Sequence, residues 1–195
     1  WATTSGGSVF HTSAPGAIDT IYIDNASFLS SDTLFYDVGT AQVAAVEMSN
    51  LNNPVFLGGI SDVLSVSGGL SINMNINHQF LGNYIFNGLG TNTIIFPDSL
   101  ATDITFNGAG IYTVSPFVTQ KQVEVIQGDI IFGNVSAESF ICTGALSKNL
   151  SFSSLDLTGS GLTLDLSAPN TALTVAPTDI TSSYSGNNSV QFAVG

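Results

Sequence analysis

Basic residues are almost absent from this sequence. It contains two lysines, Lys121 and Lys148, and no arginine, against 14 acidic residues, so the formal net charge is −12 at pH 7. Proteins that bind nucleic acids neutralise phosphates with clusters of lysine and arginine, and docking on anionic lipid headgroups needs similar clusters. The composition therefore argues against both kinds of binding, and we expect the two lysines to be solubilising surface residues.

Cysteine is represented by Cys142 alone, which excludes an intramolecular disulfide and a multi-cysteine metal site. Because Cys142 follows Phe140 and Ile141, we expect it to be a small buried residue rather than a nucleophile. Long hydrophobic runs are also lacking, since no stretch approaches the roughly 18 uninterrupted apolar residues of a transmembrane helix. The sequence thus predicts no transmembrane segment, although its mean hydropathy is +0.36.

Small uncharged residues supply most of the polarity. There are 25 serines, 19 threonines and 16 asparagines, alongside 20 glycines, whereas charged residues make up only 8% of the chain and hydrophobic residues 44%. Such a chain is too apolar to be disordered, and it is long enough for one or at most two domains with a sizeable core. Short stretches that alternate apolar and polar residues between turn residues predict an all-β fold.

Glycine recurs at intervals of twenty residues, each time after an apolar and a polar residue. The positions are Gly68, Gly88, Gly108 and Gly128, and the same phase continues to Lys148 and Ala168. Phe-Asn-Gly-x-Gly occurs twice in this series, with Asn87 and Asn107 before the glycine. We predict a β-solenoid with coils of about twenty residues, in which these glycines and asparagines form structural turns that tolerate positive φ. The alternative is an antiparallel β-sandwich or jelly roll, which has similar strand spacing.

Three regions follow from this pattern. Residues 61–181 are the repetitive β domain, and residues 182–195 are a C-terminal tail. Residues 1–60 lack the period and are expected to form an irregular capping arm with short strands. A short helix is expected at residues 40–51, where Thr40 is suited to N-capping and Ala41, Ala44 and Met48 cluster on one side.

Residues 71–77 show the strictest alternation in the chain. Ile72 and Ile76 fall on one face of the strand expected there, while Asn73, Asn75 and Asn77 fall on the other. Stacked neighbours would allow the asparagines to form amide ladders, and a solvated polar face is the simpler alternative.

Catalytic motifs are not evident. A glycoside hydrolase needs two carboxylates at a set separation, and the pairs that coil geometry would allow are Asp98 with Asp103 and Asp129 with Glu138. Aromatic residues near acids, as at Phe96 and Tyr112, are the only hint of a sugar-binding surface. The chain's two histidines, His11 and His78, have no catalytic partner nearby in sequence. Calcium-binding motifs are absent, so we predict no cofactor and no enzyme.

The repetitive part carries a family resemblance. Its Phe-Asn-Gly-x-Gly turns, Ser-Gly-Gly at residues 67–69 and Leu-Thr-Gly-Ser-Gly-Leu-Thr-Leu at residues 157–164 are similar to passenger segments of bacterial autotransporter surface proteins. The similarity covers about three fifths of the chain, and such motifs also recur in S-layer proteins and phage fibres. It implies a β-solenoid displayed outside the cell and implies no catalytic residues.

Two functions are therefore expected. The first is a secreted, non-enzymatic structural or adhesive protein of a cell surface, a subunit that assembles with copies of itself into a filament, sheath or surface layer, or that binds a host or cell-surface glycan or protein. The second is a glycan-binding or glycan-hydrolysing module on the same scaffold.

Overall fold

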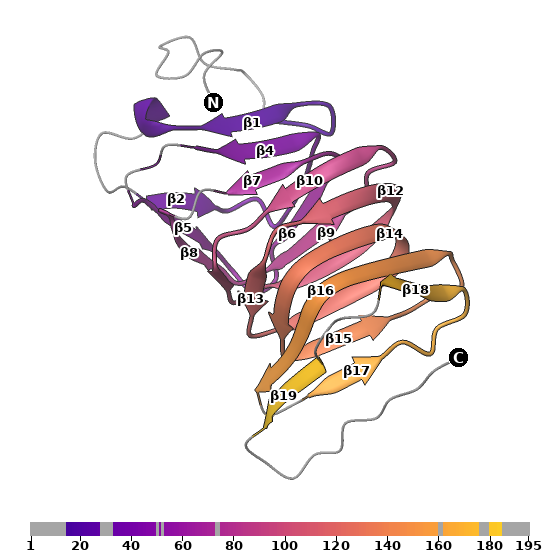
Figure 1. Ribbon diagram of the computed structural model, residues 1–195. Helices are drawn as coiled ribbons and strands as arrows, with labels where there is room; N and C mark the ends of the chain where they lie inside the picture. The colour runs from indigo at the N-terminus through magenta and orange to yellow at the C-terminus, as the bar shows by residue number, and fades with distance from the viewer. Residues whose placement is uncertain are drawn as a thin grey trace.

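The computed structural model of the protein describes residues 15–27, 33–49, 51, 53–72, 75–159, 162–175 and 180–184. Within these residues the chain is almost entirely β-strand, with one 3-10 turn at Asn25–Ser27 and no α-helix. All strand pairs in this part of the chain are parallel. The protein is a β-solenoid of about seven coils (Figure 1), which excludes the antiparallel sandwich.

Each coil has three sides, named faces A, B and C in the order in which the chain meets them. Face A contains β1 (Thr20–Ile23), β4 (Ala45–Met48), β7 (Leu70–Ile72), β10 (Thr91–Ile95) and β18 (Thr171–Val175). Face B contains β2 (Thr33–Tyr36), β5 (Val55–Gly58), β8 (Asn77–Phe80), β11 (Ser99–Leu100), β13 (Phe117–Thr119) and β19 (Ile180–Tyr184). Face C contains β3 (Thr40–Val43), β6 (Val63–Val66), β9 (Asn83–Phe86), β15 (Ser139–Cys142) and β17 (Thr163–Asp165).

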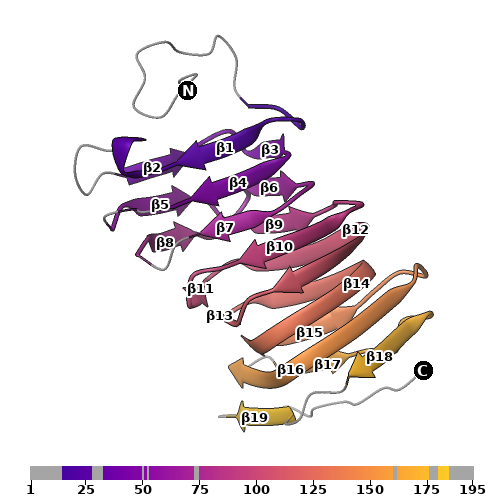
Figure 2. The ribbon, with the colours of Figure 1, turned by 45° about the horizontal axis from the view of Figure 1, so that its top comes forward.

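Three longer strands run through the corners and complete these faces. β12 (Asp103–Val114) passes from face C to face A, β14 (Gln122–Ala137) contributes to all three faces, and β16 (Lys148–Gly159) passes from face A to face B. The register between β12 and β14 shifts on either side of Asn107, as expected where a strand bends. Figure 2 shows these long strands curving around the stack.

Coil length varies along the stack. On face C, Val63 pairs with Asn83, a step of twenty residues. On face A the first step is longer, because Thr20 pairs with Ala45. Strands of neighbouring coils must lie about 4.8 Å apart to pair, so length differences are absorbed at the corners. The expected period of twenty therefore holds only for part of the solenoid.

The described part of residues 1–60 belongs to the solenoid: short strands were expected there, but their pairing with later coils was not. Strands β1 to β5 form the first coil and part of the second, and each pairs in register with a later strand. Their longer steps, up to 25 residues between Thr20 and Ala45, conceal the repeat. Residues 1–14 lie outside the described residues. At the other end, β19 runs to Tyr184, past the expected domain boundary at residue 181.

The prediction of a helix at residues 40–51 is wrong. This segment forms β3 and β4, joined by a corner at Ala44, whose amide donates to the carbonyl of Asp19 in the preceding coil at 2.8 Å. The buried side chains of this segment are Val43, Val46, Met48 and Leu51, so Met48 is the only buried member of the expected cluster. Because the corner shifts the phase of the alternation, the apolar spacing resembles a helical pattern although the chain is extended.

The prediction of a single strand at residues 71–77 is also wrong. β7 ends at Ile72, Asn75 lies in a turn, and β8 begins at Asn77. Ile72 and Ile76 are both buried, because inward positions remain inward when the chain rounds a corner. Alternation alone therefore cannot distinguish a straight strand from a corner of a coil.

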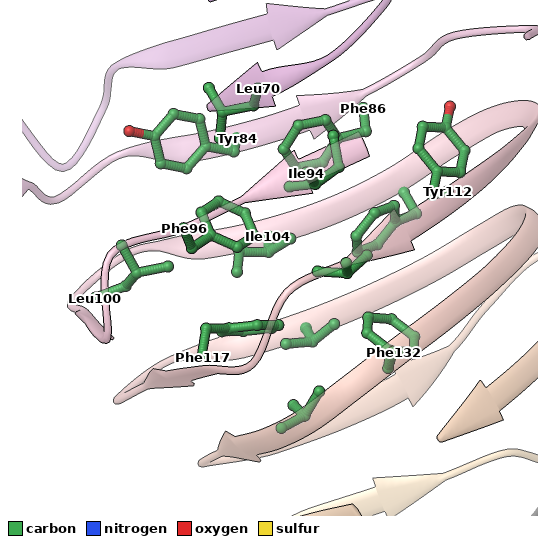
Figure 3. Packing of buried hydrophobic residues seen from close by; sticks show 14 of the residues in the cluster. Leu70, Tyr84, Phe86, Ile94, Phe96, Leu100, Ile104, Tyr112, Phe117 and Phe132 are labelled. Atoms are coloured by element: carbon green, nitrogen blue, oxygen red, sulfur yellow. The ribbon is translucent and has the colours of Figure 1, made fainter. Parts of the chain in front are cut away.

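Buried side chains fill the interior from coil to coil, and aromatic rings dominate it. Phe86 stacks on Phe106 with ring centroids 5.2 Å apart, and Phe132 stacks on Phe152 at 5.0 Å. Figure 3 shows part of this core, contributed by strands of all three faces. Full burial of each such side chain contributes about 1.5–3 kcal/mol to folding, so stacking of like residues stabilises the solenoid.

Candidate functional site

Gly68, Gly88, Gly108 and Gly128 form a column at the corner between faces C and A. A Cβ at Gly68 would lie 2.6 Å from the carbonyl oxygen of Ala44, and one at Gly128 would lie 2.7 Å from that of Gly108. Of these four glycines, only Gly128 has a positive φ, which is 116°. Glycine is required in this column chiefly because the backbones of neighbouring coils approach closely, and only at Gly128 because of conformation.

Asn87 and Asn107 lie in the same corner but do not adopt positive φ, which among described non-glycine residues occurs at Asn53 and Asn170. The side-chain oxygen of Asn87 is buried without a hydrogen-bond partner. The carbonyl of Asn107 accepts a hydrogen bond from Nε2 of Gln127, one coil further, at 2.8 Å. These residues therefore join coils rather than form independent turns.

The expected asparagine face is not assembled. Asn77 begins β8, and its partner in the neighbouring strand β5 is Val55 rather than another asparagine. Asn75 is exposed in the preceding turn, and Asn73 lies outside the described residues. Asn77 therefore forms no amide ladder with β5, because Val55 cannot hydrogen-bond through its side chain.

The carboxylates considered for hydrolysis do not meet on one face. Asp129 faces outward from face A, where its carboxylate accepts a hydrogen bond from Nδ2 of Asn149 at 2.6 Å, while Glu138 lies at the corner between faces B and C. Asp98 precedes β11, whereas Asp103 begins β12 on face C. The two members of each pair therefore lie on different sides or corners of the coil.

The aromatic residues considered for sugar binding are core residues. Phe96 is buried with its ring centroid 5.1 Å from that of Phe117. Tyr112 is also buried, and its hydroxyl donates to the carbonyl of Gly88 at 2.9 Å. Burial raises the pKa of Tyr112 to about 12, so it remains neutral. Neither ring is accessible to a glycan.

His78 points into the core and has no acid–base partner of the catalytic kind. Its Nε2 lies 2.9 Å from the hydroxyl of Tyr84, and its Nδ1 is buried without a hydrogen-bond partner. Rings of Phe56 and Phe80 pack edge-on against it. Burial lowers the pKa of His78 to about 4, so the imidazole is neutral at physiological pH. His11 lies outside the described residues.

Cys142 is buried, as expected, and its surroundings make it unreactive. Burial raises the pKa of the thiol to about 11, although Lys148 acts in the opposite direction. A thiolate is the form that attacks electrophiles. The thiol is therefore an apolar core group at neutral pH.

Lys148 corrects the expectation of a surface lysine, because it is completely buried. Its Nζ donates to the carbonyls of Leu146 at 2.6 Å, Gly144 at 3.1 Å and Pro169 at 3.3 Å. In the stack Lys148 pairs with Gly128, so it occupies the next position of the glycine column. That shared phase was visible in the sequence and was the available signal for an inward-facing lysine.

No group of three or more His, Cys, Asp or Glu side chains suited to a metal ion is found among the described residues. In the same part of the chain, no helix has the length and apolar character needed to cross a membrane. The protein's remaining features with functional potential are its outer surfaces.

The outer surface of face A carries one column of uncharged side chains. Outward positions that follow one another in register include Thr93, Thr113, Ile131 and Ser151. Ile95, Ile111 and Ile131 on this face are each at least 40% exposed. Thr93 and Thr113 are the only like neighbours in this column, and Ile111 lies in the adjacent column, where its register partner in β14 is Asp129.

A second surface gathers aliphatic and aromatic side chains on the first three coils. We call it the apolar ridge, and it consists of Phe35, Val38, Leu57, Ile60 and Leu81. Phe35 and Leu57 are register neighbours on face B, and the other three lie in the turns at the corner with face C. Sequence reasoning missed this ridge because its residues are 3 to 46 positions apart and become neighbours only through coil stacking.

No family model matches the chain, and no curated protein or solved structure is significantly similar to it.

Proposed function

We propose that this protein is a non-enzymatic structural or adhesive protein of the cell exterior, which associates with copies of itself into a filament, sheath or surface layer. The observation that carries the proposal is the column of uncharged outward residues on face A, which comes from parallel strands in register. Such surfaces pack closely against like surfaces, since few charged side chains separate them. We also propose, from the resemblance of its repeat motifs to autotransporter passenger segments, that the protein is displayed outside the cell.

The C-terminal end of the solenoid offers a contact for longitudinal growth. Leu173 in β18 pairs with Leu150, whose side chain is completely buried, yet Leu173 is 44% exposed. Another coil placed against β18 would cover this leucine and pair its backbone groups. We therefore expect the first coil of one copy to stack on the last coil of the next.

Electron microscopy of the intact chain at neutral pH in about 0.15 M salt, near physiological ionic strength, tests self-assembly. Regular filaments or sheets are expected, and Leu173→Lys should prevent them by placing a charge in the end contact. Leu89→Lys is the matched control, because Leu89 is 83% exposed at a lateral corner, and it should assemble normally. Wild-type protein that stays monomeric would refute the self-assembly part of the proposal.

Glycan binding is the second candidate function, and one observation favours it. Tyr22 is 68% exposed on face A, and its register neighbour in β4 is Glu47. An exposed ring beside a carboxylate is a typical sugar-stacking arrangement. A glycan array should then give hits that are lost in Tyr22→Ala and retained in Leu89→Ala, whereas hits that survive Tyr22→Ala would exclude this site.

A further inference from the structure

The apolar ridge is confined to one end of the solenoid. Val38, Ile60 and Leu81 occupy the corner between faces B and C in three successive coils, and Ile60 is 74% exposed. At the same corner of later coils, the described residues include Ala101, Gln120 and Glu138, and none of the described residues there is a large aliphatic residue that is exposed. Single exposed apolar residues are ordinary, but a contiguous patch with a boundary indicates an interaction surface.

The backbone of the ridge is well ordered by hydrogen bonds between coils. The amide of Val63 donates to the carbonyl of Gly39, and that of Asn83 to the carbonyl of Asp62. These bonds hold successive turns together at strand spacing of about 4.8 Å, and the ridge side chains form an irregular row, because the three turns are three, four and two residues long. A rigid row of this kind binds with little loss of conformational entropy.

Charge around the ridge is negative. Asp37 stands next to Val38, and the carboxylate of Asp62 accepts the amide of Gly59 at 2.6 Å, which fixes it beside Ile60. Lys121, the only described lysine that is not fully buried, lies at the same corner two coils beyond Leu81. A ligand of this surface must therefore supply its own positive charge.

We propose that the apolar ridge docks a segment of a partner protein in which lysine or arginine alternates with aliphatic residues. The aliphatic side chains cover the ridge, and the basic side chains lie against Asp37 and Asp62. A second copy of this chain is a poorer occupant, because it would place the same aspartates opposite one another within a net charge of −12. This inference deepens the adhesive part of the proposed function by naming the chemistry of the partner.

The test uses the full chain and a labelled peptide in which lysine alternates with leucine, with a glutamate–leucine peptide as its counterpart. Fluorescence anisotropy measures affinity, and nitrogen–proton correlation spectra locate the contact through glycine amides. Signals of Gly39, Gly59 and Gly82 at the ridge should shift. Signals of Gly90 and Gly144, at the corner between faces C and A, should not.

The double variant Ile60→Ser, Leu81→Ser should weaken binding of the lysine–leucine peptide at least about tenfold. Asp37→Asn with Asp62→Asn should weaken it and reduce its dependence on salt. Leu89→Ser is the matched control, since it removes an exposed leucine outside the ridge, and should change affinity less than about twofold. All these side chains are outside the core, and dispersion of the spectra checks that each variant is folded.

Three results would overturn the proposal. Equal affinity of wild type and ridge variant would mean general attraction to the acidic surface, and binding of the glutamate–leucine peptide would contradict charge complementarity. Dimerisation in sedimentation that Ile60→Ser abolishes would assign the ridge to a second copy. The filament test depends on Leu173 rather than on the ridge, so failure of either proposal is distinguishable from failure of the other.

Discussion

At the scale of single residues, His78 couples the stability of the core to pH. The folded protein keeps this imidazole neutral down to about pH 4, whereas an unfolded chain protonates it near pH 6.5. The unfolded state therefore binds more protons in this window, so the contribution is complete above pH 6.5 and is lost as the pH falls through 4. At 1.36 kcal/mol per pKa unit, the loss amounts to about 3 kcal/mol.

His78→Phe should remove this part of the pH dependence. The variant leaves the buried hydroxyl of Tyr84 without its partner, so it is less stable than wild type at pH 7 by about 1–2 kcal/mol. Between pH 7 and pH 4, however, its free energy of unfolding should fall by about 3 kcal/mol less than that of wild type. Urea melts at successive pH values measure both. Parallel pH profiles would show that His78 does not titrate as proposed.

Lys148 is a buried cation whose partners are all backbone carbonyls. Replacement by methionine retains the volume of the stem but removes three hydrogen bonds to the carbonyls of Gly144, Leu146 and Pro169. Charge-assisted bonds contribute about 1.5–3 kcal/mol each, and relief of the desolvated ammonium offsets several kcal/mol of this. We expect Lys148→Met to lower the free energy of unfolding by about 2 kcal/mol.

Lys121→Met is the matched control for this prediction. Lys121 is only partly buried, so its removal should change stability by less than about 0.5 kcal/mol, as for ordinary surface positions. Chemical denaturation of both variants at pH 7 makes the comparison. Equal stability of the two would mean that the carbonyl cage around Lys148 contributes nothing.

At the scale of elements, the glycine column determines whether β12 can lie against the preceding coil. A Cβ at Gly108 would collide with the carbonyl oxygen of Gly88 and with the Tyr112 hydroxyl that this oxygen binds. Gly90 belongs to the equivalent motif one coil earlier, but a Cβ there meets nothing within 4 Å. Two glycines of one repeated motif thus have different structural requirements.

Gly108→Ala should therefore destabilise the protein by about 3 kcal/mol or more, because backbone atoms must move. Gly90→Ala should change the free energy of unfolding by less than about 1 kcal/mol. An increase is expected, because alanine reduces the conformational freedom of the unfolded chain. Thermal unfolding of the two variants gives the answer. Similar losses in both would indicate that glycine is needed for flexibility of the motif rather than for close approach.

At the scale of the whole molecule, net charge opposes the proposed assembly. Each copy carries −12, and of its two lysines Lys148 is buried. Salt at 0.1 M limits repulsion to about 10 Å, so assembly should increase as sodium chloride rises from low to physiological concentration. Sedimentation velocity measures the assembled fraction.

Lys121→Glu provides the comparison, because it makes the charge more negative without reaching the core. The salt concentration at half assembly should rise in this variant and fall in Asp129→Asn, which removes a charge from face A. Greatest assembly at low salt would contradict repulsion as the limiting term and would indicate ionic contacts between copies instead.

Local pattern was sufficient to predict an all-β chain, coils of about twenty residues around the glycine column, and the burial of Cys142, because strand alternation and corner residues are short-range properties. It was insufficient where corners change length. The longer N-terminal steps concealed two coils, and a corner at Ala44 imitated a helix.

Only the tertiary structure decided which residues became neighbours. His78 meets Tyr84, Lys148 meets Pro169 and Phe35 joins Leu57 in the ridge because coil stacking brings them together. Period and alternation determine whether a side chain faces inward or outward. Corner length determines what it faces, and corner length depends on how far neighbouring coils must shift to pair their strands and fill the core.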